Sequence, residues 1–529
     1  MPEKFFNFLL KHFAQISAVI FCISDSLNCL FLIDRKFFSI YNIKHINKGI
    51  CSSLYKSIIG WTFLPTTVIV AYKSYSGYPK KVVGIFFAQN RPGCKEERKV
   101  NHMKQNSSFA LKGNVCFSTD KNTLVSGEHA YVVCENGKCA GVFSSLPEKF
   151  QGIPIRDTGD SLIIPGFTDL HLHAPQYSFR GMGMDLELLD WLNSVTFPEE
   201  SKYSDQDYAR KAYSIFAEDL KKSETTRACI FGTLHVEATD ILMELLEKTG
   251  LKTFVGKVNM DRNGPDTLQE ADAETSAADT IRWLDSCIGK YQNVRPILTP
   301  RFIPSCSDEL MKKLAEIRKR YKLPVQSHLS ENPGEVSWVQ ELCPESRFYG
   351  DAYRRFDLFG GKDCPAIMAH CVYCPDEEIQ LIKEQGVYVA HCPQSNTNLS
   401  SGIAPVKLYL EQGIHTGLGT DIAGGHSLSM LRAVADSIQV SKLHWRYIDS
   451  NRKPLTFEEA FYMGTMGGGE FFGKTGSFLE GYEFDAVILD DTYFPHPQSL
   501  TVRERLERLT YLADARCVTG KYVSGTEIF

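Results

Sequence analysis

The sequence has no uninterrupted apolar run of the ~18–20 residues that a membrane-spanning helix needs. The most apolar stretch near the start, residues 16–23, lies between Lys11 and Asp25. Lys4 and Lys11 precede this stretch as they would in a secretory signal, but no clear cleavage site of small residues follows it. We therefore expect no membrane span, and a signal peptide is the weaker interpretation.

The sequence also lacks a cysteine framework and an excess of basic residues. Its 16 cysteines are scattered, and only Cys371 and Cys374 are spaced like half of a structural zinc site. This usage predicts buried, reduced thiols, as in a cytoplasmic enzyme. The 58 Lys and Arg residues against 63 Asp and Glu give a formal net charge of −5, which argues against a dedicated nucleic-acid-binding protein.

What is present is a globular composition: 529 residues, 43% hydrophobic, enough for a large buried core. Charge is distributed unevenly, because residues 1–100 hold 14 Lys and Arg but only 5 Asp and Glu. We interpret residues 1–102 as an N-terminal extension, disordered or spurious, with Met103 as a candidate start. A membrane or organelle tether is the alternative interpretation.

Short strand-like segments flank the central part of the chain on both sides. Residues 130–133 and 139–143 are examples before it, and residues 484–489 and 520–523 follow it. The pattern predicts a small β-sandwich domain built from residues 103–162 and 475–529, whose segments could share one sheet.

Between these flanks, residues 163–474 alternate short apolar runs with helical patterns. Eight apolar runs fall at residues 162–164, 228–233, 253–258, 294–299, 324–327, 366–369, 387–390 and 416–419. Helical periodicity fills intervals such as 205–222, 240–248, 267–291, 307–321 and 376–385. Eight strand–helix units predict a (β/α)8 (TIM) barrel, with a doubly wound sheet as the alternative.

Polar side chains follow seven of these runs. They are His171, His173, His235, Arg301, His328, His370, His391 and Asp421. Side chains two apart in a strand point the same way, so His171 and His173 can bind one cation together. Imidazoles with a carboxylate suit zinc. The alternative is that each histidine is an ordinary hydrogen-bonded residue, but six of the 14 histidines fall at predicted strand ends.

Glu331 follows the candidate ligand His328 by three residues, just past a predicted strand. A carboxylate there could take a proton from a metal-bound water and deliver it to a substrate. The alternative is a solvated glutamate in a loop.

The residues around these positions resemble a known family. Pro165-Gly166-Phe167-Thr168-Asp169-Leu170-His171-Leu172-His173 is similar to the first-strand signature of the amidohydrolase superfamily. Its continuation through residue 179 looks like that of the guanine deaminase branch, as do residues 185–192, 196–199, 232–235, 255–261, 299–302, 326–332, 368–371, 391–396 and 417–425. The resemblance covers roughly residues 105–525.

This resemblance implies one zinc ion per subunit, with His171, His173, His328, His370 and Asp421 as ligands. Glu331 would be the proton shuttle, Asp421 would orient the nucleophilic water, and His370 would steady the developing charge. The purine-binding residues would be Gln176, His235, Arg301 and Phe302, with Trp191 and His391 as further candidates. Core packing is an equally good interpretation of Trp191 and Phe302.

The activity implied is hydrolysis of guanine to xanthine and ammonia in purine catabolism, by a homodimer. Alternatives are an amidohydrolase acting on a pterin, cytosine, adenosine-like or triazine substrate, and a non-enzymatic scaffold. The H-x-E and P-C-x-x-C signature of the other nucleobase deaminases is mimicked only in part, by residues 235–237 and 371–374. A PDZ-type contact of the C-terminal residues 526–529 is a further, weaker hypothesis.

Overall fold

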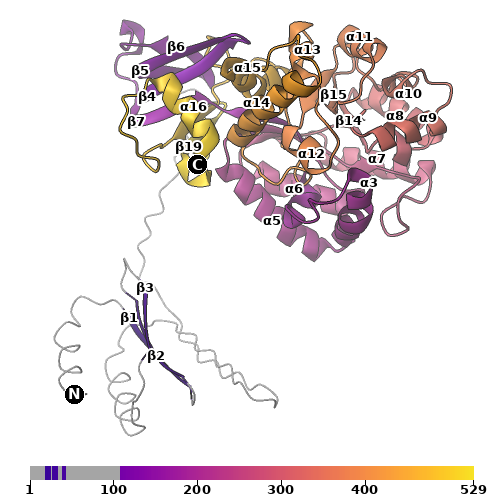
Figure 1. The fold of residues 1–529 in the computed structure, drawn as a ribbon, viewed down its shortest axis with the longest axis horizontal. Helices are drawn as coiled ribbons and strands as arrows, with labels where there is room; N and C mark the ends of the chain where they lie inside the picture. Colours follow the sequence, from indigo (N-terminus) through magenta and orange to yellow (C-terminus); the bar gives the residue numbers. More distant parts are fainter. Residues whose placement is uncertain (1–17, 25–26, 34–37, 43–107) are drawn as a thin grey trace. The chain divides into compact units, whose positions relative to one another are not determined.

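The computed structural model describes residues 18–24, 27–33, 38–42 and 108–529, and the chain divides into two units, residues 1–101 and 102–529. In the first unit, strands β1 (Ala18–Ser24), β2 (Leu27–Ile33) and β3 (Phe38–Asn42) form an antiparallel sheet (Figure 1). The predicted extension at 1–102 otherwise lies outside the described residues. Within those residues, every helix is too short or too polar to cross a membrane.

The second unit contains a seven-stranded sheet assembled from both flanks of the chain. Its order is β20-β19-β18-β7-β4-β5-β6. The strands are β4 (Phe109–Asp120), β5 (Thr123–Glu135), β6 (Lys138–Phe143), β7 (Ile155–Pro165), β18 (Ala486–Leu489), β19 (Val518–Val523) and β20 (Thr526–Glu527). Because β18 pairs with the end of β7, from Ala486 opposite Pro165 to Leu489 opposite Leu162, the prediction of a shared sheet is confirmed.

Two features of this sheet correct sequence-based expectations. The apolar run 162–164 is the end of β7, and the first of the central parallel strands begins only at Phe167. The C-terminal residues are already hydrogen-bonded to β19, because Ile528 N–H donates to Lys521 O and Phe529 O accepts from Lys521 N–H. A PDZ groove needs that backbone for itself, so this pairing argues against the PDZ hypothesis.

The central strands form parallel sheets whose buried runs of apolar residues are typical of parallel pairing. One sheet has the order β12-β10-β9-β8 and another β14-β15-β16-β17, with a short pair β11-β13. The strands are β8 (Phe167–His173), β9 (Thr225–Phe231), β10 (Lys252–Gly256), β11 (Val258–Asn259), β12 (Val294–Pro296), β13 (Thr299–Pro300), β14 (Val325–Leu329), β15 (Ala366–His370), β16 (Tyr388–His391) and β17 (Thr416–Leu418).

These two sheets meet at both sides. Strand β17 packs against β8, and an isolated parallel bridge joins Leu298 to Val325 at the start of β14. At the first junction, the Asp169 carboxylate in β8 accepts hydrogen bonds from the backbone N–H of Thr420 (3.0 Å) and its hydroxyl (2.5 Å), just after β17. The ends of β8 and β17 are thereby fixed side by side.

Helices connect successive strands (Figure 1). They are α3 (Leu188–Trp191), α4 (Phe197–Glu200), α5 (Gln206–Lys222), α6 (Val236–Glu247), α7 (Ala273–Cys287), α8 (Asp308–Tyr321), α9 (Pro333–Leu342), α10 (Tyr349–Arg354), α11 (Asp376–Gln385), α12 (Pro393–Asn398), α13 (Val406–Glu411), α14 (Met430–Tyr447), α15 (Phe457–Tyr462) and α16 (Val502–Leu512). The apolar faces of α5 to α11 pack with the central strands in one large core. Helices α14, α15 and α16 pack in a second core with β7 and β18.

Helix ends follow local capping chemistry. Asp205 caps α5 by accepting the N–H groups of Asp207 and Tyr208, and Ser307 caps α8 through Leu310 N–H. Helix α7 is shorter than the predicted 267–291, because the Asp272 side chain caps it by accepting Thr275 N–H. Gly289, with a φ of 76°, lies just past its other end.

The thiols of residues 108–529 agree with the prediction of reduced cysteines. Those in this range are free, and all except Cys374 are buried.

Candidate active site

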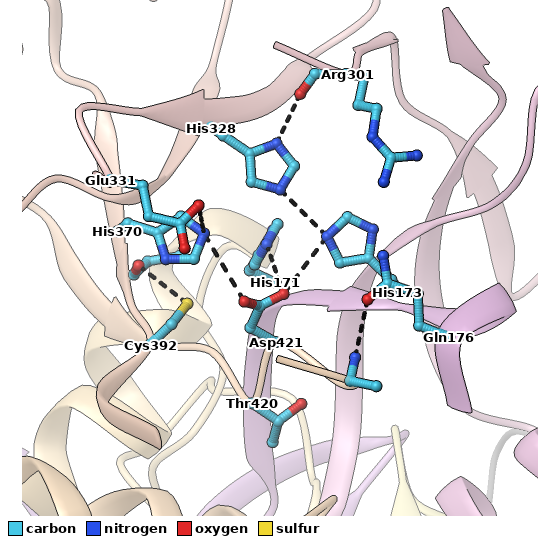
Figure 2. Close-up of polar contacts among 12 residues, drawn as sticks. His171, His173, Gln176, Arg301, His328, Glu331, His370, Cys392, Thr420 and Asp421 are labelled. Carbon is cyan, nitrogen blue, oxygen red and sulfur yellow. Dashed lines mark hydrogen bonds and ion pairs between the residues drawn. The ribbon is translucent and has the colours of Figure 1, made fainter. Parts of the chain in front are cut away.

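Five side chains converge at the carboxyl ends of the parallel strands (Figure 2). His171 and His173 lie two apart in β8, so both point to the same side of the strand. His328 comes from β14, His370 ends β15, and Asp421 follows β17. All but His328 are almost completely buried, and His328 is half-buried.

The ligand atoms of these side chains lie within a few ångströms of one another. Asp421 Oδ1 lies 3.2 Å from His171 Nε2 and 3.4 Å from His173 Nε2, and Asp421 Oδ2 lies 3.8 Å from His370 Nε2. His173 Nε2 and His328 Nε2 are 3.2 Å apart. We call these five residues the metal-ligand cluster.

Hydrogen bonds to Nδ1, the ring nitrogen that points away from the cluster, fix the orientation of two imidazoles. His328 Nδ1 lies 2.6 Å from the carbonyl oxygen of Arg301, and His370 Nδ1 lies 2.8 Å from Asn396 Oδ1. Since a carbonyl oxygen accepts a hydrogen bond, Nδ1 carries the proton and Nε2 presents its lone pair to the cluster.

The charge states favour metal binding as well. Burial lowers the pKa of His171, and lowers those of His173 and His328 well below the usual value, which leaves neutral imidazoles. Burial opposes ionisation of Asp421, but the neighbouring His171, His370 and His173 lower its pKa, so it is a carboxylate. Neutral imidazoles and a carboxylate are the donor set of zinc.

The cluster fits a metal ion by a geometric test too. The ligand atoms of His171, His328 and His370 all lie within 4.8 Å of one another, as do those of His171, His173 and Asp421. Among the described residues, Nε2 of both His171 and His370 has no hydrogen-bond partner despite its burial. A divalent cation between these atoms would satisfy both nitrogens.

Glu331 lies beside the cluster, two residues past the end of β14. Its Oε2 is 3.4 Å from His370 Nε2, and its Oε1 accepts a hydrogen bond from the hydroxyl of Ser401 at 3.0 Å. Burial and the charge of Asp421 raise the pKa of Glu331 to about 8. A carboxyl group with a pKa near neutrality is suited to both accepting and donating a proton.

A second buried carboxyl group supports the segment that carries Glu331. Glu335 Oε2 accepts the backbone N–H of Glu331 at 3.0 Å, and its Oε1 accepts the hydroxyl of Tyr349 at 2.7 Å. Burial and the charge of Glu331 raise the pKa of Glu335 to about 7.

A cavity opens next to the cluster and Glu331. It is lined by His173, Gln176, Leu188, Trp191, Leu192, Arg301, Phe302, His328, Glu331, Glu335, His370, Leu399 and Asp421. Both polar groups and apolar side chains therefore line the cavity, as in sites that bind small ligands.

Gln176 and Arg301 are joined by a buried carboxylate, Glu200 at the end of α4. Arg301 Nη1 donates to Glu200 Oε2 at 2.5 Å and Nη2 to Oε1 at 3.2 Å. Gln176 Nε2 donates to Glu200 Oε1 at 2.8 Å, while Gln176 Oε1 accepts the N–H of Ala423 at 3.0 Å. We call Gln176, Glu200 and Arg301 the carboxylate clamp.

The structure thus brings most of the residues singled out from the sequence to one place, but His235 and His391 belong neither to the metal-ligand cluster nor to the cavity lining. His235 precedes α6, half-buried, and does not line this cavity. His391 ends β16, is buried, and has no hydrogen-bond partner on either ring nitrogen among the described residues. Burial and the nearby His370 lower the pKa of His391 to about 3.

Four residues that contact this site were not identified from the sequence: Glu200, Glu335, Asn396 and Ser401. Asn396 lies in a segment that resembles the family, but its contact with His370 is a tertiary one. Glu200 directly follows the family-like segment 196–199, and no other pattern in the sequence marked it. Nothing in the local pattern marked Glu335 or Ser401.

Comparisons with known proteins agree with this geometry. The sequence profile of the Amidohydrolase family matches residues 162–528. A guanine deaminase of Dictyostelium discoideum is 41% identical over 380 residues, which are 70% of this chain and 83% of that protein. A guanine deaminase of Mus musculus is 37% identical over 422 residues, 76% of this chain and 92% of that protein.

Among solved structures, a guanine deaminase from C. acetobutylicum with guanine bound in its active site is similar to this fold. The two superpose with a TM-score of 0.77 and are 47% identical, over 80% of this chain and 100% of that one.

Proposed function

The chain belongs to the amidohydrolase family, and from that premise we infer that its active site hydrolyses the exocyclic C–N bond of guanine. The products are xanthine and ammonia. The observation that carries this inference is the arrangement of the metal-ligand cluster, Glu331 and the carboxylate clamp around one cavity. It joins a site for activating water to a site for recognising a polar purine edge.

We propose that the parallel strands close into a (β/α)8 barrel. The contacts between β17 and β8 and the bridge from Leu298 to Val325 support closure at the two junctions of the sheets. Closure would place the metal-ligand cluster at the carboxyl-terminal face of the barrel, where such barrels carry their active sites. We also propose that the seven-stranded sheet folds as a small β-sandwich.

We propose zinc as the metal, one ion per subunit, held by His171, His173, His328, His370 and Asp421. When bound there, zinc would lower the pKa of a water molecule to near neutrality and so supply the nucleophile. The donor set supports this choice, since four imidazoles and one carboxylate suit zinc better than a hard cation that prefers oxygen ligands.

Glu331 moves the protons of the reaction. The carboxylate takes a proton from the attacking water and gives it to ring N3 of guanine, which removes the aromatic resistance of C2 to attack. A second proton, from the hydroxyl group now bonded to C2, passes to the exocyclic amino group. This group leaves as ammonia when its bond to C2 breaks, and the oxygen becomes the C2 carbonyl of xanthine. The position of Glu331 between His370 and the cavity supports this role.

Gln176 and Arg301 bind the polar edge of the purine, and Phe302 and Trp191 contact the ring. Trp191 is fixed by its own indole N–H, which donates to the carbonyl of Met182 at 3.0 Å. Phe302 meets Trp338 edge-on, with ring centroids 6.2 Å apart. Both rings are therefore held as rigid walls of the cavity.

From the family resemblance we also propose that the protein forms a homodimer, lies in the cytoplasm and acts in purine catabolism. The acidic charge of residues 101–529 and the buried thiols are compatible with a cytoplasmic location.

The test of the proposed function is an ammonia-release assay of the purified full chain on a nucleobase panel. We expect turnover of guanine, little or none of adenine, cytosine and triazines, and loss of turnover on dialysis against a chelator. Restoration by added zinc would identify the metal. Turnover of another base with none of guanine would contradict the proposal.

A further inference from the structure

We propose that Glu200 determines substrate specificity, by holding Gln176 and Arg301 as paired hydrogen-bond donors that select a 6-oxopurine over a 6-aminopurine. The inference rests on the proposed function, because it assigns the origin of guanine selection within that site. Glu200 is a positioning residue: it does not line the cavity itself, and it acts through two residues that do.

The first step of the argument is the number of hydrogen bonds that Glu200 accepts. Its carboxylate takes two from the Arg301 guanidinium and one from the Gln176 amide. Its side chain is only 3% exposed and that of Arg301 only 5%. A buried bidentate pair of this kind fixes the guanidinium plane far better than an exposed ion pair would.

The second step is the polarity of the Gln176 amide. The carboxylate of Glu200 accepts hydrogen bonds, so the amide nitrogen must face it. At the other end, the N–H of Ala423 donates, so the amide oxygen must face that group. Both ends of the amide are therefore specified, and the amide cannot turn over without losing two hydrogen bonds.

The third step is what remains for a ligand. Arg301 has only donors, and Gln176 Nε2 has a second N–H beyond the one that Glu200 accepts. Figure 2 shows both side chains on the side of the metal-ligand cluster opposite Glu331. A purine whose C2 lies near Glu331 would turn its other ring edge toward these donors.

That edge distinguishes guanine from its 6-amino counterpart. Guanine offers O6 and N7, two acceptors, to the two donors. 2,6-Diaminopurine carries the same 2-amino leaving group and the same N7, but it has N–H donors at position 6. The 6-amino group would then point its N–H donors at the N–H donors of Arg301 and Gln176 in a buried site. Leaving these donors unpaired costs more binding free energy than the loss of one hydrogen bond from an exposed site.

Glutamine at position 200 would preserve shape but not this pattern. Its amide has one acceptor oxygen in place of two, so it cannot accept all three hydrogen bonds that the carboxylate accepts from Arg301 Nη1, Arg301 Nη2 and Gln176 Nε2. Its own NH2 group would also face one of those donors. At least one recognition side chain would lose its fixed orientation.

The experiment compares ammonia release from guanine and from 2,6-diaminopurine by the wild-type chain, Glu200→Gln and the control Glu199→Gln. Glu199 adjoins Glu200 in α4 but pairs with Lys202 at 2.6 Å, away from the cavity. The ratio of kcat/KM for the two substrates, measured on one preparation, does not depend on the folded fraction. We expect Glu200→Gln to lower the guanine preference at least tenfold, with KM for guanine raised more than kcat is lowered. Glu199→Gln should stay within about twofold of the wild type.

Three outcomes are decisive. An unchanged ratio in active Glu200→Gln would overturn the inference while leaving the proposed function intact, whereas a wild-type chain inert on guanine would contradict the proposed function itself. Where Glu200→Gln does not fold, Glu200→Asp is measured, because it draws the carboxylate back from both donors. We then expect KM for guanine to rise fivefold or more with kcat within about threefold, and an unchanged KM would overturn the inference.

Discussion

At the scale of single residues, Glu331 combines three features of a proton shuttle. It lies 3.4 Å from a metal-ligand histidine, it lines the cavity, and its pKa is raised to about 8 by burial and by Asp421. Its carboxyl group is held by Ser401, and its backbone by Glu335. Ser401 and Glu335 therefore orient the carboxyl group that we propose to transfer the protons.

Replacing Glu331 by Gln tests this role. The amide keeps the shape and the contact with Ser401 but cannot exchange a proton, so we expect kcat to fall about 10³-fold. Metal content and guanine binding should persist. Steady-state kinetics, elemental analysis and calorimetric titration with guanine measure the three quantities.

The control for this variant is Glu341→Gln, an exposed glutamate of α9, the helix that follows Glu331. It should behave like the wild type. Turnover by Glu331→Gln within tenfold of the wild type would remove Glu331 from the mechanism.

Residue-level prediction from the sequence succeeded where the period of a strand sufficed. His171 and His173 had to share a face because they lie two apart in a strand. Glu200 could not be found in this way, because its role comes from tertiary contacts with Arg301, 101 positions along the chain, and with Gln176, 24 positions away.

At the scale of secondary-structure elements, strand β19 contains a buried lysine. Lys521 is fully buried, and its Nζ donates to the carbonyl oxygens of Leu220 (3.3 Å) and Thr225 (2.9 Å) at the junction of α5 and β9. Burial lowers the pKa of Lys521 from 10.5 to about 7, although the nearby Glu224 opposes the shift. Strand β19, next to the edge strand β20, thus contacts α5 and β9 through an amine that is readily neutral in the folded chain.

A pH-dependent stability follows from this depressed pKa. Between about pH 7 and 10.5 the unfolded chain holds a proton on Lys521 that the folded chain has lost, so this residue makes stability rise with pH. The contribution is complete above the unfolded pKa and is lost as pH falls toward 7. The slope is at most about 1.4 kcal/mol per pH unit.

Urea unfolding of the wild type and Lys521→Met from pH 7.5 to 9.5 measures this slope. We expect the stability difference, wild type minus variant, to rise with pH. The exposed lysine of α14, replaced in Lys442→Met, is the control and should show no such rise. A flat or falling difference for Lys521→Met would contradict the buried neutral amine.

The elements themselves were predictable to different degrees. Helix α11 matches its predicted range because Gly386, with a φ of 62°, stops it where the periodicity ends. The run at 162–164 was assigned to the wrong sheet, because an apolar triplet does not reveal its partner. The pairing of β7 with β4 and with β18, the latter more than 300 positions away, decides that question.

At the scale of the whole molecule, the seven-stranded sheet and the parallel strands are joined by buried charge. Arg227 in β9 donates from Nε to Asp485 Oδ2 at 2.6 Å and from Nη2 to Oδ1 at 3.1 Å, just before β18. Asp485 also accepts Ser524 N–H at 2.8 Å, beyond β19. The C-terminal part of the seven-stranded sheet is thus held to β9, one of the parallel strands.

The central claim is that side chains from four strand ends, spread over 250 positions of the chain, hold one metal ion beside a guanine-binding cavity. The most direct measurement is an anomalous difference map from crystals of the full chain, collected on both sides of the zinc absorption edge. The account predicts a single strong peak between the Nε2 atoms of His171, His173, His328 and His370 and the carboxylate of Asp421. The absence of a peak there, or a peak at Cys371 and Cys374 instead, would contradict it.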